Sequence, residues 1–296
     1  MAERSVLAVR YGHRVTSYGE MFLNYPLYGE PDADLDIAYY FWIIRDGSRV
    51  TLVDTGFAPE AGDRRGRAHH TTPAQALPAL GIDPADVGAI VITHAHWDHI
   101  GNIGQFPQAE LVLTEAEYAF WTSPMAARAH FAAHSEPGEI AQLERARAQD
   151  RVTLFSGELT LAPGVELIEV GGHTPGQLIV LAETSGAGTA TSAGTATSAA
   201  GTAVLASDAL HFYAEAERDR PFAIVADLPA MYRTYDLLND LAGQRATYLV
   251  AGHDPLVRQR FAAHPAGKDV TDPGVPERDQ VRDGRPHALL VVDRDR

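Results

Sequence analysis

The chain carries the sequence Thr93-His94-Ala95-His96-Trp97-Asp98-His99, with three histidines and one aspartate within six positions. It follows residues 87–92, an apolar run with the length of a buried strand. Side chains alternate between the two faces of a strand, so His94 and His96 point the same way in extended backbone. Asp98 and His99 follow where the chain turns. Because imidazole and carboxylate groups suit zinc, iron or manganese, this cluster predicts a metal site at the end of the strand.

Three further ligand candidates stand at the ends of other predicted strands. His173 lies in the turn at residues 171–176, Asp208 follows the apolar residues 205–206, and His253 lies in Gly252-His253-Asp254. Neighbouring glycines let the backbone approach a crowded site. Taken singly, a histidine is more often a surface or core residue than a ligand, so these candidates depend on the order in which the motifs occur.

Short apolar runs separated by turn residues predict many strands and few helices. The predicted strands cover residues 5–10, 38–45, 49–54, 87–93, 110–113, 151–155, 159–161, 165–170, 177–182 and 248–251. The predicted helices cover residues 72–80, 114–121, 139–149 and 229–241. Residues 184–203 repeat Gly-Thr-Ala-Thr-Ser-Ala without a large apolar side chain, which predicts a flexible loop between two paired strands.

The composition limits the partners of the chain. Of its 296 residues 24 are basic and 39 are acidic, which gives a net charge of −15. Nucleic-acid binding depends on lysine and arginine, so we expect a small-molecule substrate and no nucleic acid. The apolar runs are too short to span a membrane, which predicts no membrane partner. The absence of cysteine excludes thiolate ligands and disulfides and agrees with a cytoplasmic location.

The ordered motifs resemble those of the metallo-β-lactamase superfamily. The resemblance covers residues 36–257 and includes His-x-His-x-Asp-His, Gly-x-His-Thr-x-Gly, Ser-Asp, Gly-His-Asp and an early Asp54-Thr55-Gly56. It implies an α/β (α+β) fold, the four-layer αββα sandwich, with metals at one edge between the sheets. We therefore predict a catalytic domain over residues 1–264 and a C-terminal tail over residues 265–296, in which residues 288–292 either add an edge strand or stay disordered.

The resemblance also implies the role of each ligand in a site for two divalent metal ions, zinc by expectation, with iron, manganese or cobalt as alternatives. One metal would be held by His94, His96 and His173, the other by Asp98, His99 and His253, with Asp208 bridging both. Asp54 is either a support behind these ligands or a plain turn residue at a strand end.

Within the superfamily the chain looks most like the N-acyl homoserine lactonases, the quorum-quenching hydrolases. The shared features are residues 96–102, 208–213 and 252–257. One position departs from this pattern, since well-known lactonases of the group place a tyrosine three residues after the bridging aspartate, where this chain has His211. Tyr213 stands two residues farther on, and we expect it to face elsewhere. The departure bears on the substrate more than on the reaction class.

The expected reaction is opening of a lactone ring by a hydroxide that the two metals share. One metal would stabilise the oxyanion, and the other would meet the leaving alkoxide. Asp98 would pass a proton to that alkoxide. His211 would either donate a hydrogen bond to the carbonyl or serve only the structure.

Several alternatives stay open at this point. The same site would suit another ester, a thioester, an amide or a cyclic substrate; a phosphodiesterase, a mononuclear iron sulfur dioxygenase and a non-enzymatic metal-binding role rank below these. Residues 115–149 form either a helical cap over a substrate pocket or ordinary core. Residues 18–28, rich in aromatic side chains, form either a second pocket wall or a homodimer interface.

Overall fold

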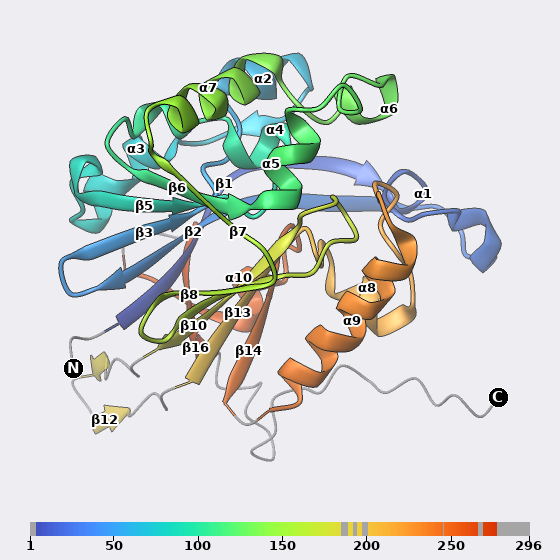
Figure 1. Ribbon diagram of the computed structural model, residues 1–296. Helices are drawn as coiled ribbons and strands as arrows, with labels where there is room; N and C mark the ends of the chain where they lie inside the picture. The colour runs from blue at the N-terminus through green and yellow to red at the C-terminus, as the bar shows by residue number, and fades with distance from the viewer. Residues whose placement is uncertain are drawn as a thin grey trace.

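The computed structural model of the chain describes residues 4–184, 189–191, 194–196, 201–244, 246–265 and 269–276. Two sheets pack against each other and helices cover their outer faces (Figure 1). These four layers are those of the predicted αββα sandwich. No helix in the described part of the chain is long and apolar enough to cross a membrane.

The larger sheet has nine strands. Along its path they are β15 (Phe261–Ala263), β16 (Val270–Pro276), β1 (Arg4–Ser17), β2 (Asp34–Asp46), β3 (Arg49–Val53), β5 (Val87–Val91), β6 (Glu110–Thr114) and β7 (Val152–Phe155), with β4 (Ala68–His69) paired to β1. Strands β3, β5, β6 and β7 run parallel, so their carboxyl ends meet at one edge.

The smaller sheet has five strands. In order they are β14 (Thr247–Ala251), β13 (Gly201–Ser207), β10 (Leu178–Thr184), β9 (Val165–Glu169) and β8 (Glu158–Ala162). Strands β13 and β14 are parallel, whereas β10 pairs antiparallel with both β9 and β13. The predicted pairing across residues 184–203 is therefore present. Within that range β11 (Thr189–Thr191) and β12 (Gly194–Ala196) pair with each other, and the other residues between 185 and 200 lie outside the described part.

The helices are short, and most of them belong to the half of the chain that forms the larger sheet. They are α1 (Tyr18–Met21), α2 (Pro59–Arg64), α3 (Pro73–Ala76), α4 (Trp97–Ile100), α5 (Glu115–Trp121), α6 (Ala129–Ala132), α7 (Pro137–Ala148), α8 (Tyr213–Arg218), α9 (Leu228–Ala242) and α10 (Val257–Arg260), with single 3-10 turns η1 (Tyr25–Tyr28), η2 (Leu77–Leu80), η3 (Pro84–Asp86) and η4 (Ile103–Gln105). Helices α5 and α7 pack against β7, and α9 packs against β14.

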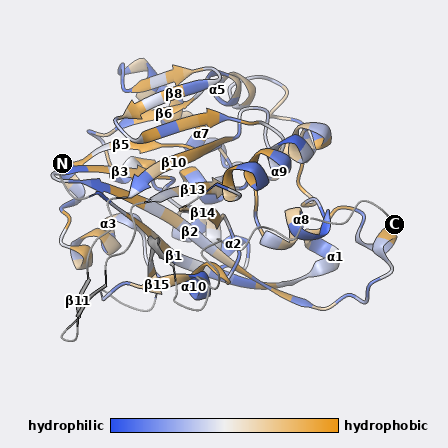
Figure 2. Ribbon diagram, turned by 90° about the horizontal axis from the view of Figure 1, so that it is seen from below, coloured by the Kyte–Doolittle hydropathy of each residue, from blue (hydrophilic) through white to orange (hydrophobic). Residues whose placement is uncertain are grey.

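The core lies between the sheets and on both faces of the larger one. Strand β2 shows this best, because every residue from Ile37 to Ile44 is at most 5% exposed. An unbroken apolar strand is expected where both faces are covered, whereas one open face would give alternation. Helix α9 differs from this unbroken apolar strand, because Figure 2 shows both hydrophobic and hydrophilic residues along its length. This rigid centre fixes the strand ends from which the site is built.

The prediction of a C-terminal tail from residue 265 needs correction. Residues 270–276 form β16, which pairs antiparallel with β1 through Val9 and Val270, and Arg10 beside it bonds Asp269. The backbone groups of an otherwise open edge are satisfied in this way. The apolar residues 288–292 lie outside the described part of the chain.

Other elements differ in their bounds. The predicted helix over residues 72–80 divides into α3 and η2, because Pro78 lacks the amide donor that would continue the α-helical hydrogen bonds. Strand β1 continues to Ser17, well past the predicted end at residue 10, because its pairing with β2 resumes after a bulge between Arg10 and Gly12.

Candidate metal centre

Seven side chains from four segments meet at the edge where the parallel strands end. They form two groups, each with its ligand atoms within 4.8 Å of one another: His94, His96, His173 and Asp208, and then Asp98, His99 and His253. The first cluster in the sequence follows β5, Asp208 follows β13, His253 follows β14, and His173 lies between β9 and β10. The structure thus brings together all seven residues expected as metal ligands.

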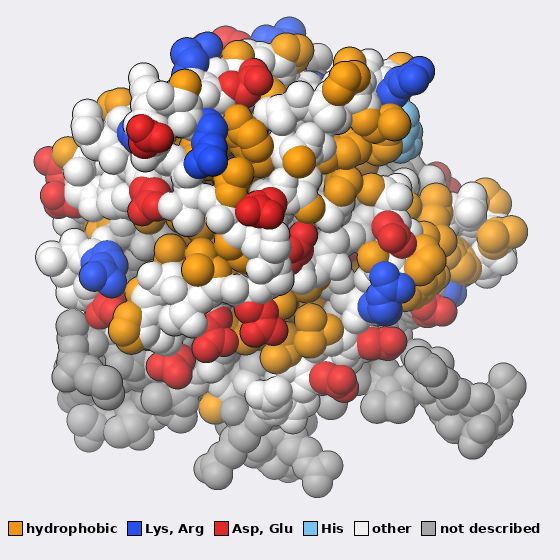
Figure 3. Space-filling view, viewed as in Figure 1, with side chains coloured by type: hydrophobic (Ala, Val, Ile, Leu, Met, Phe, Trp, Pro, Cys, Tyr) orange, Lys and Arg blue, Asp and Glu red, His pale blue; other side chains and the backbone are white. Residues whose placement is uncertain are grey.

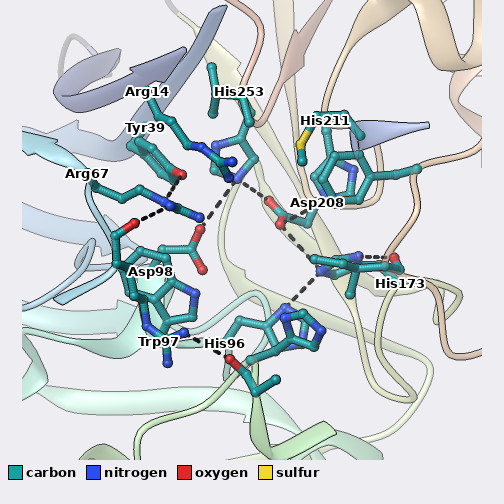
Figure 4. A pocket seen from close by; sticks show the side chains of 17 residues that line it. Arg14, Tyr39, Arg67, His96, Trp97, Asp98, His173, Asp208, His211 and His253 are labelled. Atoms are coloured by element: carbon teal, nitrogen blue, oxygen red, sulfur yellow. Dashed lines mark hydrogen bonds and ion pairs between the residues drawn. The ribbon is translucent and has the colours of Figure 1, made fainter. Parts of the chain in front are cut away.

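Asp208 belongs to the first group and also faces the histidines of the second (Figure 4). Its Oδ2 is 3.4 Å from Nε2 of His173 and 3.7 Å from Nε2 of His94. Its Oδ1 is 2.9 Å from Nε2 of His253 and 3.2 Å from Nε2 of His99. One carboxylate therefore presents one oxygen to each group, which is the arrangement of a bridging ligand.

The outer nitrogen of each of four histidine rings has a partner that fixes the direction of the ring. Nδ1 of His173 donates to the carbonyl of Ile224 at 2.8 Å, and Nδ1 of His253 donates to the carbonyl of Ala38 at 2.9 Å. Nδ1 of His99 lies 2.7 Å from Asp54, and Nδ1 of His94 lies 3.2 Å from the Thr93 hydroxyl. Such contacts hold the opposite atom, Nε2, toward the centre, as they do behind metal-bound histidines.

His96 is turned the other way and faces the centre with Nδ1. This nitrogen lies 3.0 Å from Nε2 of His94 and 2.9 Å from Nε2 of His173. Burial, followed by the neighbouring imidazoles, holds the pKa of His96 well below its usual value. Burial also lowers the pKa of His94 and His173. Neutral imidazoles crowded around one point are the form that binds a metal ion.

Two buried polar atoms at the centre are better placed to coordinate a cation than to form a hydrogen bond with each other. Within the described residues, Nε2 of His99 and Oδ1 of Asp208 make no hydrogen bond of acceptable geometry, although they lie 3.2 Å apart and both are inaccessible to solvent. Buried polar atoms are nearly always satisfied, so such a pair needs an explanation. A metal ion would satisfy both, and the ligand set of imidazole and carboxylate suits zinc and its neighbours.

Asp54 lies directly behind these ligands. Its carboxylate is fully buried, accepts the amide of Thr93 at 2.8 Å and the Thr93 hydroxyl at 2.7 Å, and contacts His99 at 2.7 Å. Its backbone has a φ of 61°, in the left-handed region that Asp tolerates better than most residues. Of the two predicted roles, the geometry favours support of the ligands over a plain turn.

His211 lies beside the bridging carboxylate. Its Nε2 is 3.1 Å from Oδ2 of Asp208, its Nδ1 is 3.3 Å from Glu215, and its ring stacks on Phe222 with centroids 3.5 Å apart. Burial works against charge on this ring, but the carboxylates of Asp208 and Glu215 prevail and raise its pKa to about 9. Tyr213 faces elsewhere, as expected, and donates its hydroxyl to the carbonyl of Leu249.

Glu117 supports the site and was not anticipated from the sequence. This buried carboxylate accepts the amide of Ala95 at 2.8 Å, the indole of Trp121 at 2.6 Å and the amide of Gly176 at 3.0 Å. It therefore joins the two turns that carry His96 and His173. A glutamate at the start of a helix gives no local signal of such a contact, because its partners are distant in the chain.

A pocket of about 270 Å³ opens onto the two ligand groups. Its apolar wall includes Met21, Phe222 and Ile224, and its other wall carries three arginines: Arg14, Arg65 and Arg67. The arginines were also missed from the sequence. The available signal was Arg64-Arg65-Gly66-Arg67, a basic run in an acidic chain.

The segments with open roles lie partly at this pocket. Ala133 and His134 line it, and Phe120, Trp121 and Phe131 line a small adjoining cleft, whereas α7 covers the larger sheet. Residues 115–149 thus divide between the pocket rim and ordinary packing. A contribution of residues 115–149 or of residues 18–28 to substrate binding stays a prediction. The homodimer also stays a prediction.

Comparisons with known proteins agree with this geometry. The model of the metallo-beta-lactamase superfamily matches residues 37–253. The N-acyl homoserine lactonase AttM of Azorhizobium caulinodans is 29% identical over 254 residues, which are 80% of this chain and 89% of that protein. The lactonase AiiB of Agrobacterium fabrum is 30% identical over 158 residues, 49% of this chain and 57% of the relative. A Bacillus lactonase is matched over 63% of its length at 28% identity.

Solved structures share the fold. A quorum-quenching N-acyl homoserine lactone lactonase superposes with a TM-score of 0.67 at 18% identity, covering 90% of this chain and 98% of that one. The dizinc quorum-quenching lactonase AidC, solved with a product, superposes with a TM-score of 0.62 at 19% identity, covering 86% and 89%. At this identity the likeness concerns the fold alone.

Proposed function

The chain belongs to the metallo-β-lactamase superfamily, and from this premise we propose that it is a dinuclear metal-dependent hydrolase that opens a lactone ring. The observation that carries the proposal is the position of Asp208, which presents one oxygen to each of two ligand groups. The names of the relatives, which are N-acyl homoserine lactonases, supply the substrate class.

The two groups support the metal assignment that the resemblance implies. His94, His96 and His173 would hold one ion, Asp98, His99 and His253 the other, and Asp208 both. Bound divalent ions supply a water ionised near neutral pH and polarise the ester carbonyl. Zinc is our choice of ion because one structural relative is described as a dizinc enzyme.

The protein groups around this centre would position the substrate and move protons. Asp98 lines the pocket with a side chain that is 12% exposed, so it can reach a leaving alkoxide as well as a metal. His211 also lines the pocket, and the stacked Phe222 holds its ring in place. We assign Asp98 the transfer of a proton to the alkoxide and His211 a hydrogen bond to the ester carbonyl.

The test is ring opening followed by proton release at constant pH, across N-acyl homoserine lactones and simple γ- and δ-lactones. We expect turnover by the metal-loaded wild type and a loss of at least about 100-fold in His96→Ala, with less bound metal. His70→Ala is the matched control, because His70 pairs with His13 outside both ligand groups. Absence of turnover in wild type that holds its metals would contradict the proposal and direct attention to other esters, thioesters and amides.

A further inference from the structure

One wall of the pocket is basic although the chain is strongly acidic. Arg14, Arg65 and Arg67 line the same pocket as Asp98 and His253, whereas the whole chain has a net charge of −15. On the face shown in Figure 3, the arginine side chains are scattered among Asp and Glu. Figure 4 shows Arg14 and Arg67 on the side of the pocket that also carries Tyr39 and Asp98. The grouping of three cations at the candidate site therefore requires a specific reason.

Trp97, inside the metal-ligand motif, links these cations to the site. The guanidinium carbon of Arg65 lies 4.7 Å from the centre of the Trp97 ring, and that of Arg67 lies 5.8 Å from it. Phe57 stacks against the same indole with centroids 5.2 Å apart. Cation–π contacts of this kind hold a guanidinium in place without neutralising it. The residue between His96 and Asp98 thus fixes two positive charges next to the metal ligands.

The three arginines differ in what balances their charge. Arg14 forms an ion pair with Glu20 at 2.5 Å, and Arg65 forms one with Glu136 at 2.8 Å. Arg67 has neutral partners, since Nε donates to the Tyr39 hydroxyl at 3.1 Å and Nη1 donates to the carbonyl of Arg65. Within the described residues, no carboxylate oxygen lies within 4.0 Å of its guanidinium nitrogens. Arg67 is thus a preorganised cation at the pocket wall without an ion-pair partner of its own, and Glu20, which pairs with Arg14, acts on it only from a longer distance.

We propose that the substrate of this site carries a carboxylate remote from the bond that is cut, and that Arg67 binds this carboxylate. The inference rests on the proposed function and narrows its substrate class from lactones in general to anionic lactones. A guanidinium matches a planar carboxylate through two parallel hydrogen bonds. Charge-assisted hydrogen bonds of this type are stronger than hydrogen bonds between neutral groups. Glu20 and Glu136 balance the charges of Arg14 and Arg65, so the proposal rests on Arg67.

The test compares two lactones of equal size, N-glutaryl homoserine lactone and its terminal carboxamide, with the metal-loaded protein. We expect wild type to favour the carboxylate in kcat/KM by at least about tenfold, the factor that one charge-assisted hydrogen bond supplies. In Arg67→Gln this preference should fall to nearly one. Arg64→Gln is the matched control, because Arg64 is 59% exposed, pairs with Glu136 as Arg65 does, and does not line the pocket.

Two further measurements distinguish a failure of this inference from a failure of the proposed function. Arg67→Lys retains the charge without the planar fork, so an intermediate preference is expected. Calorimetric titration with glutarate and with glutaramide should show tighter binding of the dianion to wild type than to Arg67→Gln at equal metal content. Equal turnover of both lactones by wild type, or an undiminished preference in Arg67→Gln, would overturn this inference and leave lactone opening standing. Failure to open either lactone would instead contradict the proposed function, while the titration still reports on Arg67.

Discussion

At the scale of single residues, Asp54 acts on the site through its neighbours. It joins the amide of Thr93 to the ring of His99 from a fully buried position. We expect Asp54→Ala to weaken metal binding by roughly 10- to 100-fold, the usual effect of removing a support behind a ligand. Chelator competition measures this affinity. Asp63→Ala, at an exposed position of α2, should bind metal as wild type does, and equal affinity in both variants would count against the role of Asp54.

His211 makes a different prediction, because it faces the pocket. If it bonds the reacting carbonyl, His211→Ala should lower kcat on the order of 100-fold while metal content stays at the wild-type level. The readout is kcat together with metal analysis. His211→Tyr should recover part of the loss, since it restores the side chain that the resembling lactonases carry at this position. Full activity in both variants would assign His211 a structural role only.

The residues of the centre could be predicted to the extent that they stand in ordered motifs. The cluster at residues 94–99 is recognisable from its composition, and His173 is recognisable from its place in the order of the motifs. Glu117 and Arg67 do not, because what makes them important is a contact with a distant turn or ring. A single charged residue in a helix or loop can have many roles in the local sequence. Only its contacts in the folded chain show which role it has.

At the scale of elements, Glu117 on α5 holds two turns of the site together. Its carboxylate accepts from Ala95, Trp121 and Gly176, so Glu117→Ala would leave three buried donors without a partner. We expect the free energy of unfolding to fall by about 3 kcal/mol or more, given the cost of unsatisfied buried groups. Urea unfolding measures the change. Glu115→Ala, exposed on the same helix, should differ little from wild type, and a similarly small effect at Glu117 would contradict the account.

Glu139 on helix α7 predicts how the stability of the folded chain depends on pH. Burial, and then the carboxylate of Glu136, raise the pKa of Glu139 from 4.5 to about 8. The folded chain therefore holds this proton at pH values where the unfolded chain has lost it. Stability from this group is fully present below about pH 4.5 and is lost as the pH rises through about 8. We expect Glu139→Gln to be more stable than wild type at pH 8.5 and equal to it near pH 4.5.

Denaturant unfolding of both proteins across this range checks the sign. Glu144→Gln, exposed on the same helix, should show no such difference at either pH. A difference between Glu139→Gln and wild type that shrinks toward alkaline pH would contradict the assignment.

Helices and strands could be predicted where the local sequence pattern determines them. They could be predicted less well where pairing with a strand distant in the sequence determines them. The strand ending at Val91 and the helix around Met231 follow from their apolar spacing. Strand β16 does not, because Pro273 and Gly274 interrupt its pattern and its pairing with β1 supplies what the sequence lacks. The far end of β1 is stabilised in the same way by β2.

At the scale of the whole molecule, the order of parallel strands explains how one site is built from distant segments. Strands β3 and β5 of one sheet and β13 and β14 of the other end at the same edge. Residues at successive strand ends therefore converge although they are separated by up to two hundred positions, as Asp54 and His253 are. A cytoplasmic location stays a prediction, as does the choice of zinc.

The most direct measurement is the recovery of lactone opening as zinc is titrated into metal-free protein, with bound metal counted at each step. If Asp208 joins two ions into one catalytic centre, activity should stay low through the first equivalent and rise with the second, reaching its maximum at about two ions per chain. Full activity with one ion bound, or none with two, would contradict the account.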